Sequence, residues 1–276
     1  MARDGHGGKR SDRDGRRRGD RPREGAGPER PPREAAPRMA AKRPLIWGFH
    51  AAAAALKARR REIVRIHATA AAAERLVADG LAKPGEIAVV DQAALAALLP
   101  RDAVHQGVAV EAGPLPELGL EDVPDGGLVL VLDQVTDPHN FGAILRTAAA
   151  FGVDAVVTTD RHAPPLTDVV AKAASGGAEF TPVVRVVNLA RALDELGERG
   201  FHRVGLDSEG DADLAALAPR RPLALALGAE GAGLRRLTRE RCDALARIDL
   251  PGPIKSLNVS NACAVALACV TATSRE

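Results

Sequence analysis

The feature that most constrains the fold is a long region, beginning at Leu128, in which short apolar runs alternate with helical patterns. The apolar runs cover residues 128–132, 153–159, 183–187, 204–206 and 223–227, and helices are predicted at 141–151, 168–174 and 189–200. Strands that alternate with helices usually run parallel, because each helix carries the chain back to the same edge of the sheet. The pattern therefore predicts an α/β fold with a parallel sheet.

A polar loop at residues 133–142 follows the first of these runs and leads into the helix predicted at 141–151. It contains Asn140, and Arg146 follows six residues later, roughly one and a half helical turns along. Ligands of open α/β sheets bind outside the carboxyl ends of the strands, where this loop is expected. An isolated arginine on a helix usually faces solvent, but this position makes Arg146 a candidate site residue.

A glycine-rich loop, residues 228–234, follows the apolar run at 223–227 directly. Its spacing, GxxGxG, differs from the GxGxxG fingerprint of dinucleotide-binding folds. Glycines such as Gly228 let a ligand approach the backbone closely, while the carboxylate of Glu230 is available to the site. The alternative is a flexible surface turn, which the strongly apolar strand before the loop makes less favourable.

A third loop lies at residues 248–262, where an apolar run is stopped by Pro251, Gly252 and Pro253. Asn258 is a candidate N-cap, because the residues after it repeat apolar side chains at helical spacing. A strand, a rigid loop and a helix start together place backbone donors around one point. The alternative is an ordinary connection between a strand and a helix.

The region before the predicted parallel sheet has a different pattern. Residues 43–112 alternate short helical and strand segments in a small α/β unit, and the Pro- and Gly-rich residues 113–127 are predicted to be a linker to a second domain, 128–276. The small unit contains no catalytic pattern and carries a basic helix end at residues 57–61. It is interpreted as a binding module.

The first 42 residues are predicted to be a disordered tail. They contain 13 Lys and Arg against 7 Asp and Glu, and they are rich in Gly and Pro with few apolar residues. The net charge of +6 suits an arm that attracts RNA by releasing counterions, although a merely solubilising tail has the same composition. The tail lacks the apolar segment of a signal peptide, and its acidic residues argue against a mitochondrial presequence.

Composition also excludes several classes of protein. No uncharged apolar run approaches the ~20 residues needed to cross a bilayer. Cys242, Cys263 and Cys269 have no CxxC spacing, so the sequence predicts neither a zinc site nor a disulfide framework. A reduced cytoplasmic compartment, with no membrane and no metal, is expected.

The three loops together resemble the three motifs of the SpoU/TrmH family, the RNA ribose 2′-O-methyltransferases of the SPOUT superfamily, over about residues 128–272. Trp47-Gly48-Phe49-His50 and His105-Gln106-Gly107-Val108 resemble parts of the L30e-like substrate-binding domain of some members. Members with that domain include enzymes that methylate a guanosine ribose of bacterial 23S ribosomal RNA, and the chain most resembles those.

The resemblance implies a C-terminal trefoil knot in the parallel-sheet domain, a homodimer, and S-adenosyl-L-methionine as the cofactor. It further implies that backbone groups of three residues bind the cofactor and that five side chains form the catalytic neighbourhood. The cofactor residues are Gly228, Ile248 and Leu257, and the catalytic residues are Asn140, Arg146, Glu230, Ser256 and Asn258.

Methyl transfer to a ribose hydroxyl is an in-line displacement, so the site must align the hydroxyl and deal with its proton. The resemblance implies that Arg146 handles this hydroxyl. Because arginine is a poor base, Arg146 is interpreted as an orienting and charge-stabilising donor, or as a base if bound RNA perturbs it strongly.

Four other functions stay open at this point. Within the family, the RNA is alternatively a transfer RNA or an antibiotic-resistance site on ribosomal RNA. Outside it, the chain is alternatively a non-catalytic RNA-binding ribosome assembly factor or a nucleotide-dependent oxidoreductase. The missing GxGxxG pattern argues against the last of these.

Overall fold

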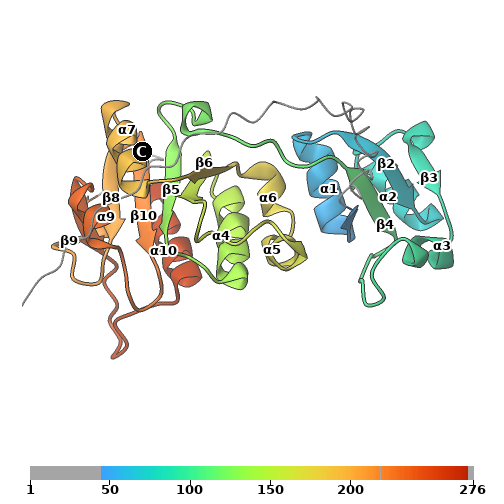
Figure 1. Cartoon of the computed structure of the whole chain (residues 1–276). Coiled ribbons are helices and arrows are strands. Elements are labelled where there is room, and N and C mark those ends of the chain that lie inside the picture. The colour runs from blue at the N-terminus through green and yellow to red at the C-terminus, as the bar shows by residue number, and fades with distance from the viewer. Residues whose placement is uncertain (1–44, 218, 273–276) are drawn as a thin grey trace, which may run out of the picture. The chain divides into compact units, whose positions relative to one another are not determined.

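The computed structural model of the protein describes residues 45–217 and 219–272 (Figure 1). The basic tail predicted for residues 1–42 lies outside the described residues. The described chain contains two β-sheets, one from the N-terminal segment and one from the segment that begins at β5.

The first sheet has four described strands, and its order is β1-β4-β2-β3. Strand β4 runs antiparallel to both β1 and β2, whereas β3 runs parallel to β2. Its elements are β1 (Leu45–Trp47), α1 (Phe49–Ala58), β2 (Ile63–Ala68), α2 (Ala70–Ala78), the short 3-10 helix η1 (Pro84–Glu86), β3 (Ile87–Val89), α3 (Gln92–Ala97) and β4 (Val108–Ala112). This is the small α/β pattern predicted for the region.

The second sheet has seven described strands in the order β7-β6-β5-β10-β8-β11-β9, and every neighbouring pair is parallel. The strands are β5 (Leu128–Asp133), β6 (Ala155–Thr159), β7 (Val183–Val186), β8 (His202–Leu206), β9 (Ala212–Asp213), β10 (Leu223–Gly228) and β11 (Ala244–Arg247), and the 3-10 helix η2 (Leu120–Asp122) precedes them. The prediction of an α/β fold with a parallel sheet is confirmed.

Helices cover both faces of this sheet (Figure 1). Helices α4 (Pro138–Ala150), α5 (Asp168–Ala174), α6 (Gly177–Phe180), α8 (Leu214–Leu217) and α10 (Val259–Ala272) contribute to the core on one face. Helix α7 (Leu189–Glu198) covers the other face and contacts α9 (Arg236–Glu240).

Strand β5 shows why its sequence is apolar throughout. Leu130 and Leu132 belong to the core beneath α4 and α10, whereas Val129 and Val131 belong to the core beneath α7. All four side chains are fully buried, because alternate residues of a strand point to opposite faces and both faces are covered.

Helix α4 begins at Pro138, three residues earlier than predicted, so Asn140 lies in the helix and not in the loop before it. The side chain of Asp137 caps the helix by accepting a hydrogen bond from the backbone N–H of His139 at 2.9 Å. A proline at the first helical position suits this start, because a backbone N–H at that position would have no partner within the helix. Asp137 and Pro138 therefore place the start of α4 earlier than the apolar spacing predicts.

The third loop also differs from its prediction. The strand before it, β11, ends at Arg247, so Ile248 follows the strand and does not begin it. The short elements α6, α8, α9 and β9 were not predicted at all. The trefoil knot implied by the resemblance stays a prediction, because strand order and register do not establish whether the chain passes through a loop.

Candidate functional site

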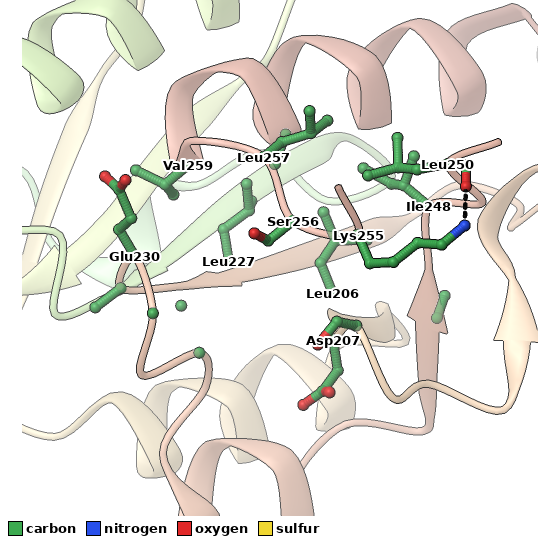
Figure 2. A pocket seen from close by; sticks show the side chains of 17 residues that line it. Leu206, Asp207, Leu227, Glu230, Ile248, Leu250, Lys255, Ser256, Leu257 and Val259 are labelled. Atoms are coloured by element: carbon green, nitrogen blue, oxygen red, sulfur yellow. Dashed lines mark hydrogen bonds between the residues drawn. The ribbon is translucent and has the colours of Figure 1, made fainter. Parts of the chain in front are cut away.

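A cavity of about 180 Å³ lies at the carboxyl ends of β8, β10 and β11, next to the start of α10 (Figure 2). It is lined by the glycine-rich loop after β10 and by the proline-containing loop after β11. Parallel strands bring these ends to one edge of the sheet although they are far apart in the sequence. Among the predicted site residues, the lining includes Gly228, Glu230, Ile248, Ser256 and Leu257.

The glycine-rich loop is tightly folded on itself. The backbone N–H of Gly233 donates to the carbonyl of Ala229 at 2.9 Å, which closes the turn. A Cβ atom added to Gly228 would lie 2.0 Å from the carbonyl carbon of Gly233 and 2.3 Å from the nitrogen of Leu234. Glycine is therefore needed at position 228 by the backbone of its own loop, and not only by an approaching ligand as the sequence suggested.

Asp133, at the end of β5, holds the residues that directly follow this loop. Its side chain is completely buried, and it is paired in register with Gly228 on β10. Its carboxylate accepts hydrogen bonds from Arg235 Nε at 2.6 Å, from the backbone N–H of Arg235 at 3.0 Å and from Thr238 Oγ1 at 2.6 Å. A buried carboxylate with this many donors fixes the segment that follows the glycines.

Asn258 joins the second and third loops. Its Nδ2 donates to Glu230 Oε2 at 3.1 Å, while its Oδ1 accepts from the backbone N–H of Ser260 at 2.9 Å. The second bond confirms the predicted N-cap of α10. One side chain therefore sets both the helix start and the position of Glu230, whose carboxylate is on the glycine-rich loop (Figure 2).

Asn140 and Arg146 lie on α4, outside the set of described residues that line the cavity. Helix α4 packs against α10, so both are on a neighbouring element, and the Arg146 side chain is exposed. Six of the eight predicted residues are therefore at the cavity: five line it, and Asn258 is hydrogen-bonded to one of these five, Glu230. The cofactor and catalytic roles of all eight stay predictions.

Two charged residues that line the cavity were not predicted. Asp207 follows β8, and its nearly buried carboxylate accepts from Arg239 Nη1 at 2.5 Å. Lys255 Nζ donates to the carbonyl of Leu250 at 2.6 Å, which holds the proline-containing loop (Figure 2). Asp207 was detectable, because a polar residue directly after an apolar strand is the signal that selected the first loop.

The cysteines of this region are not set up as nucleophiles. Cys263 lies in the core on α10, and burial raises the pKa of its thiol to about 12. Burial likewise raises the pKa of the Cys242 thiol to about 12. Both thiols stay protonated at neutral pH, and the thiolate is the reactive form. The described residues also contain no group of His, Cys, Asp and Glu suited to a metal ion, and no helix long and apolar enough to cross a membrane.

Two family models match the chain. Residues 127–268 match the SpoU rRNA Methylase family, and residues 45–118 match the domain described as RNA 2′-O ribose methyltransferase substrate binding. The two matches cover the second and first sheets, respectively.

Curated relatives are similar over most of the chain. A protein of Ralstonia nicotianae named 23S rRNA (guanosine-2′-O-)-methyltransferase RlmB is 43% identical over 236 residues, which are 82% of this chain and 94% of the relative. The protein of the same name from Pseudomonas aeruginosa is 47% identical over 173 residues, which are 60% of this chain and 70% of the relative.

Solved structures share the fold. A crystal structure described as an RNA 2′-O ribose methyltransferase superposes with a TM-score of 0.67 at 27% identity, covering 87% of this chain and 92% of that one. The SpoU methyltransferase AviRb from Streptomyces viridochromogenes, in complex with AdoMet, has a TM-score of 0.68 at 24% identity, covering 87% of this chain and 93% of that one.

Proposed function

Because the chain belongs to the SpoU rRNA Methylase family, we propose that it transfers a methyl group from S-adenosyl-L-methionine to the 2′-hydroxyl of a guanosine in 23S ribosomal RNA. The observation that carries the proposal is the cavity, where two of the three motif loops meet at the carboxyl edge of the sheet. Full-length relatives that carry the 23S ribosomal RNA guanosine name support the choice of substrate.

The residues of the cavity suit this cofactor. Gly228, Ile248 and Leu257 line it, so their backbone groups are available to hold the cofactor as the family pattern implies. Apolar side chains such as Leu227 and Val259 lie in the same lining and suit an adenine ring. The cofactor supplies a methyl group on a positively charged sulfur, which leaves the protein to align the acceptor.

The side chains of this chain would then orient the ribose and stabilise its oxygen. The pair of Glu230 and Asn258 fixes the entrance to α10, whose first backbone N–H groups favour developing negative charge. Ser256 lines the cavity beside them. The guanidinium of Arg146, a planar fork of donors, would donate a hydrogen bond to the 2′-oxygen while the hydroxyl proton passes to solvent and the methyl group arrives from the cofactor.

A homodimer is part of this proposal. Helix α10 contains no charged residue, and Ala264, Val265 and Ala268 lie on the side that the core does not bury. This side also carries exposed Asn261 but no charge, and a helix whose outer side is mostly apolar is usually covered, which supports a second copy packed against it. A stable monomer at micromolar concentration in analytical ultracentrifugation would contradict the dimer.

The experiment that tests the function is a map of 2′-O-methylated riboses in RNA from a strain that lacks the gene. We expect one guanosine of 23S ribosomal RNA to lose its methyl group and to regain it when the wild-type gene is restored. Loss of a methyl group from a transfer RNA instead would show that the substrate is transfer RNA and not 23S ribosomal RNA. An unchanged map, with no binding of S-adenosyl-L-methionine by calorimetry, would favour a non-catalytic RNA-binding factor. We also place this activity in the cytoplasm, where bacterial ribosomal RNA is modified.

A further inference from the structure

A second cavity, of about 440 Å³, lies at the same carboxyl edge of the large sheet, beside β6 and β7. It is bounded by the ends of these strands, the start of α7 and the first part of α9. We propose that it binds a phosphate and the adjoining nucleotide of the RNA, outside the methylated ribose. This inference rests on the proposed function, since it assigns that RNA a second point of contact.

The first observation is a buried hydroxyl with no partner. Thr159 ends β6 and lines the cavity, and the residue is only 5% exposed. Its Oγ1 atom is buried and has no hydrogen-bond partner among the described residues. A buried polar group without a partner is unfavourable, so a ligand that accepts a hydrogen bond from this hydroxyl would satisfy it.

The second observation is the start of α7, a helix of ten residues that begins at this cavity. The side chain of Asn188 accepts from the backbone N–H of Arg191 at 3.2 Å, which caps one of the free amides. The amides of Leu189 and Ala190 come before the first intrahelical bond, and both residues line the cavity. Such amides, together with the helix dipole, favour an anion.

The third observation is the charge of the lining. Arg161, His162 and Arg236 are exposed there, and no residue that lines the cavity carries a carboxylate. Arg235 also lines it, but buried Asp133 balances its charge. Arg236 pairs with Glu240, but the Arg236 side chain is 76% exposed, so the interaction is weak and leaves the guanidinium free to move to a phosphate.

Apolar side chains complete the cavity. Val187 is 88% exposed and Leu237 is 49% exposed, and both belong to the lining. Exposed apolar groups beside cations and a buried hydroxyl suit a nucleotide, whose base or ribose is apolar on its faces and whose phosphate is anionic.

The position of the cavity favours an RNA strand over a free nucleotide. Strands β6 and β10 are separated only by β5, so their ends lie about 10 Å apart. One segment serves both cavities, because the glycine-rich loop lines the first and the residues directly after it, Arg235 to Thr238, line the second. An RNA segment of a few nucleotides would reach from one cavity to the other.

The test compares two pairs of substitutions that remove the same charge. Arg161→Gln with Arg236→Gln removes two cations from the cavity, whereas Arg220→Gln with Arg221→Gln removes two exposed cations just before β10, at the opposite edge of the sheet. The probe is a 23S ribosomal RNA fragment that contains the methylated guanosine. Its affinity is measured at several salt concentrations, alongside methyl-transfer kinetics and calorimetric binding of S-adenosyl-L-methionine.

We expect the cavity pair to weaken RNA binding about tenfold and to raise the KM for RNA more than it lowers kcat. It should also reduce the salt dependence, by about 0.7 to 0.9 in logarithmic slope for each phosphate that the protein no longer neutralises. The affinity for S-adenosyl-L-methionine should not change, and the control pair should shift RNA affinity less than about twofold. Equal effects of the two pairs, or none, would overturn the proposal.

A third variant tests the hydroxyl itself. Thr159→Val keeps the shape of the side chain and removes the unpaired group, so it should weaken RNA binding several-fold without lowering the stability of the fold. Unchanged RNA affinity would remove Thr159 from the contact and overturn the site as drawn. Guanosine monophosphate that saturates the cavity at the concentration where the RNA does would also overturn it, in favour of a free nucleotide. These are binding results, so they stand apart from a failure of the wild-type protein to methylate RNA, which would refute the proposed function instead.

Discussion

Replacing Gly228 by alanine adds one methyl group at the place where the glycine-rich loop folds back on itself. The new Cβ would lie 2.0 Å from the carbonyl carbon of Gly233, whereas ordinary contacts begin at about 3.4 Å, so the loop must move by about 1.4 Å. The atoms in the way belong to the backbone and cannot rotate aside. Glu230 is in the displaced loop and holds Asn258, so the shift reaches the start of α10.

A displacement of about 1 Å in a reacting geometry lowers activity on the order of 100-fold. We therefore expect Gly228→Ala to reduce both the affinity for S-adenosyl-L-methionine and kcat/KM by about 100-fold or more, equivalent to about 2.7 kcal/mol. Overpacking costs typically about 1–3 kcal/mol of stability, so the domain should still fold. Isothermal calorimetry measures the binding, and urea unfolding verifies the fold.

Gly252→Ala is the matched control. It makes the same change in the proline-containing loop, where an added Cβ meets no atom within 4 Å and the backbone is not left-handed. This variant should bind S-adenosyl-L-methionine within about twofold of the wild type. If Gly228→Ala also bound within about twofold, the tight turn would not support the cavity and the reasoning would be refuted.

Four further predictions concern other parts of the molecule. Arg146→Ala should keep near-normal RNA and cofactor binding but lose methyl transfer at saturating substrates. Arg146→Lys should restore methyl transfer poorly, because lysine lacks the planar fork of donors. Near wild-type rates of methyl transfer by Arg146→Ala would exclude a role of Arg146 in the reaction. Asp133→Asn should destabilise the fold by about 3 kcal/mol in urea unfolding, since both carboxylate oxygens accept hydrogen bonds and the amide keeps only one acceptor and no charge; an unchanged midpoint would contradict this. The hydrogen bond from Arg203 lowers the pKa of Asp243 below its ordinary value of 3.8. The ionised carboxylate therefore stabilises the fold at neutral pH, and this stabilisation is lost as the pH falls through the lowered pKa. Asp243→Asn should be less stable than the wild type at pH 7 but equally stable in strong acid. Removing residues 1–42 should weaken RNA binding and reduce its salt dependence without changing cofactor affinity, and an unchanged salt slope would assign the tail no contact with RNA.

The parts of the fold that depend on local pattern were predictable. Strand β5 and helix α5 were identified with bounds within one residue, because apolar runs and small loop residues mark them in the sequence. The start of α4 was misplaced because the cap formed by Asp137 and Pro138 outweighs the apolar spacing that suggested residue 141. Short elements such as α6 carry too few residues for a periodic signal.

The assembly of the site was predictable only through the family resemblance. Strand β10 pairs with β5, nearly a hundred residues away, and no spacing in the sequence indicates this neighbour. The bond between Asn258 and Glu230 and the contacts of Asp133 with Arg235 arise from that pairing, so the sequence alone could name the residues but not their partners. The exposed position of Arg146, outside the lining of the cavity, was likewise not foreseen.

The central claim is that the cavity between the glycine-rich and proline-containing loops directs a methyl group to a ribose of 23S ribosomal RNA. The most direct measurement incubates the purified full-length protein with S-adenosyl-L-methionine labelled on its methyl group and with ribosomal RNA from a strain that lacks the gene. Digestion of the RNA to nucleosides then locates the label. The account predicts 2′-O-methylguanosine from 23S ribosomal RNA as the labelled product, and a loss of this product with Gly228→Ala but not with Gly252→Ala. Label on a base, or label of equal yield from the Gly228→Ala protein, would contradict it.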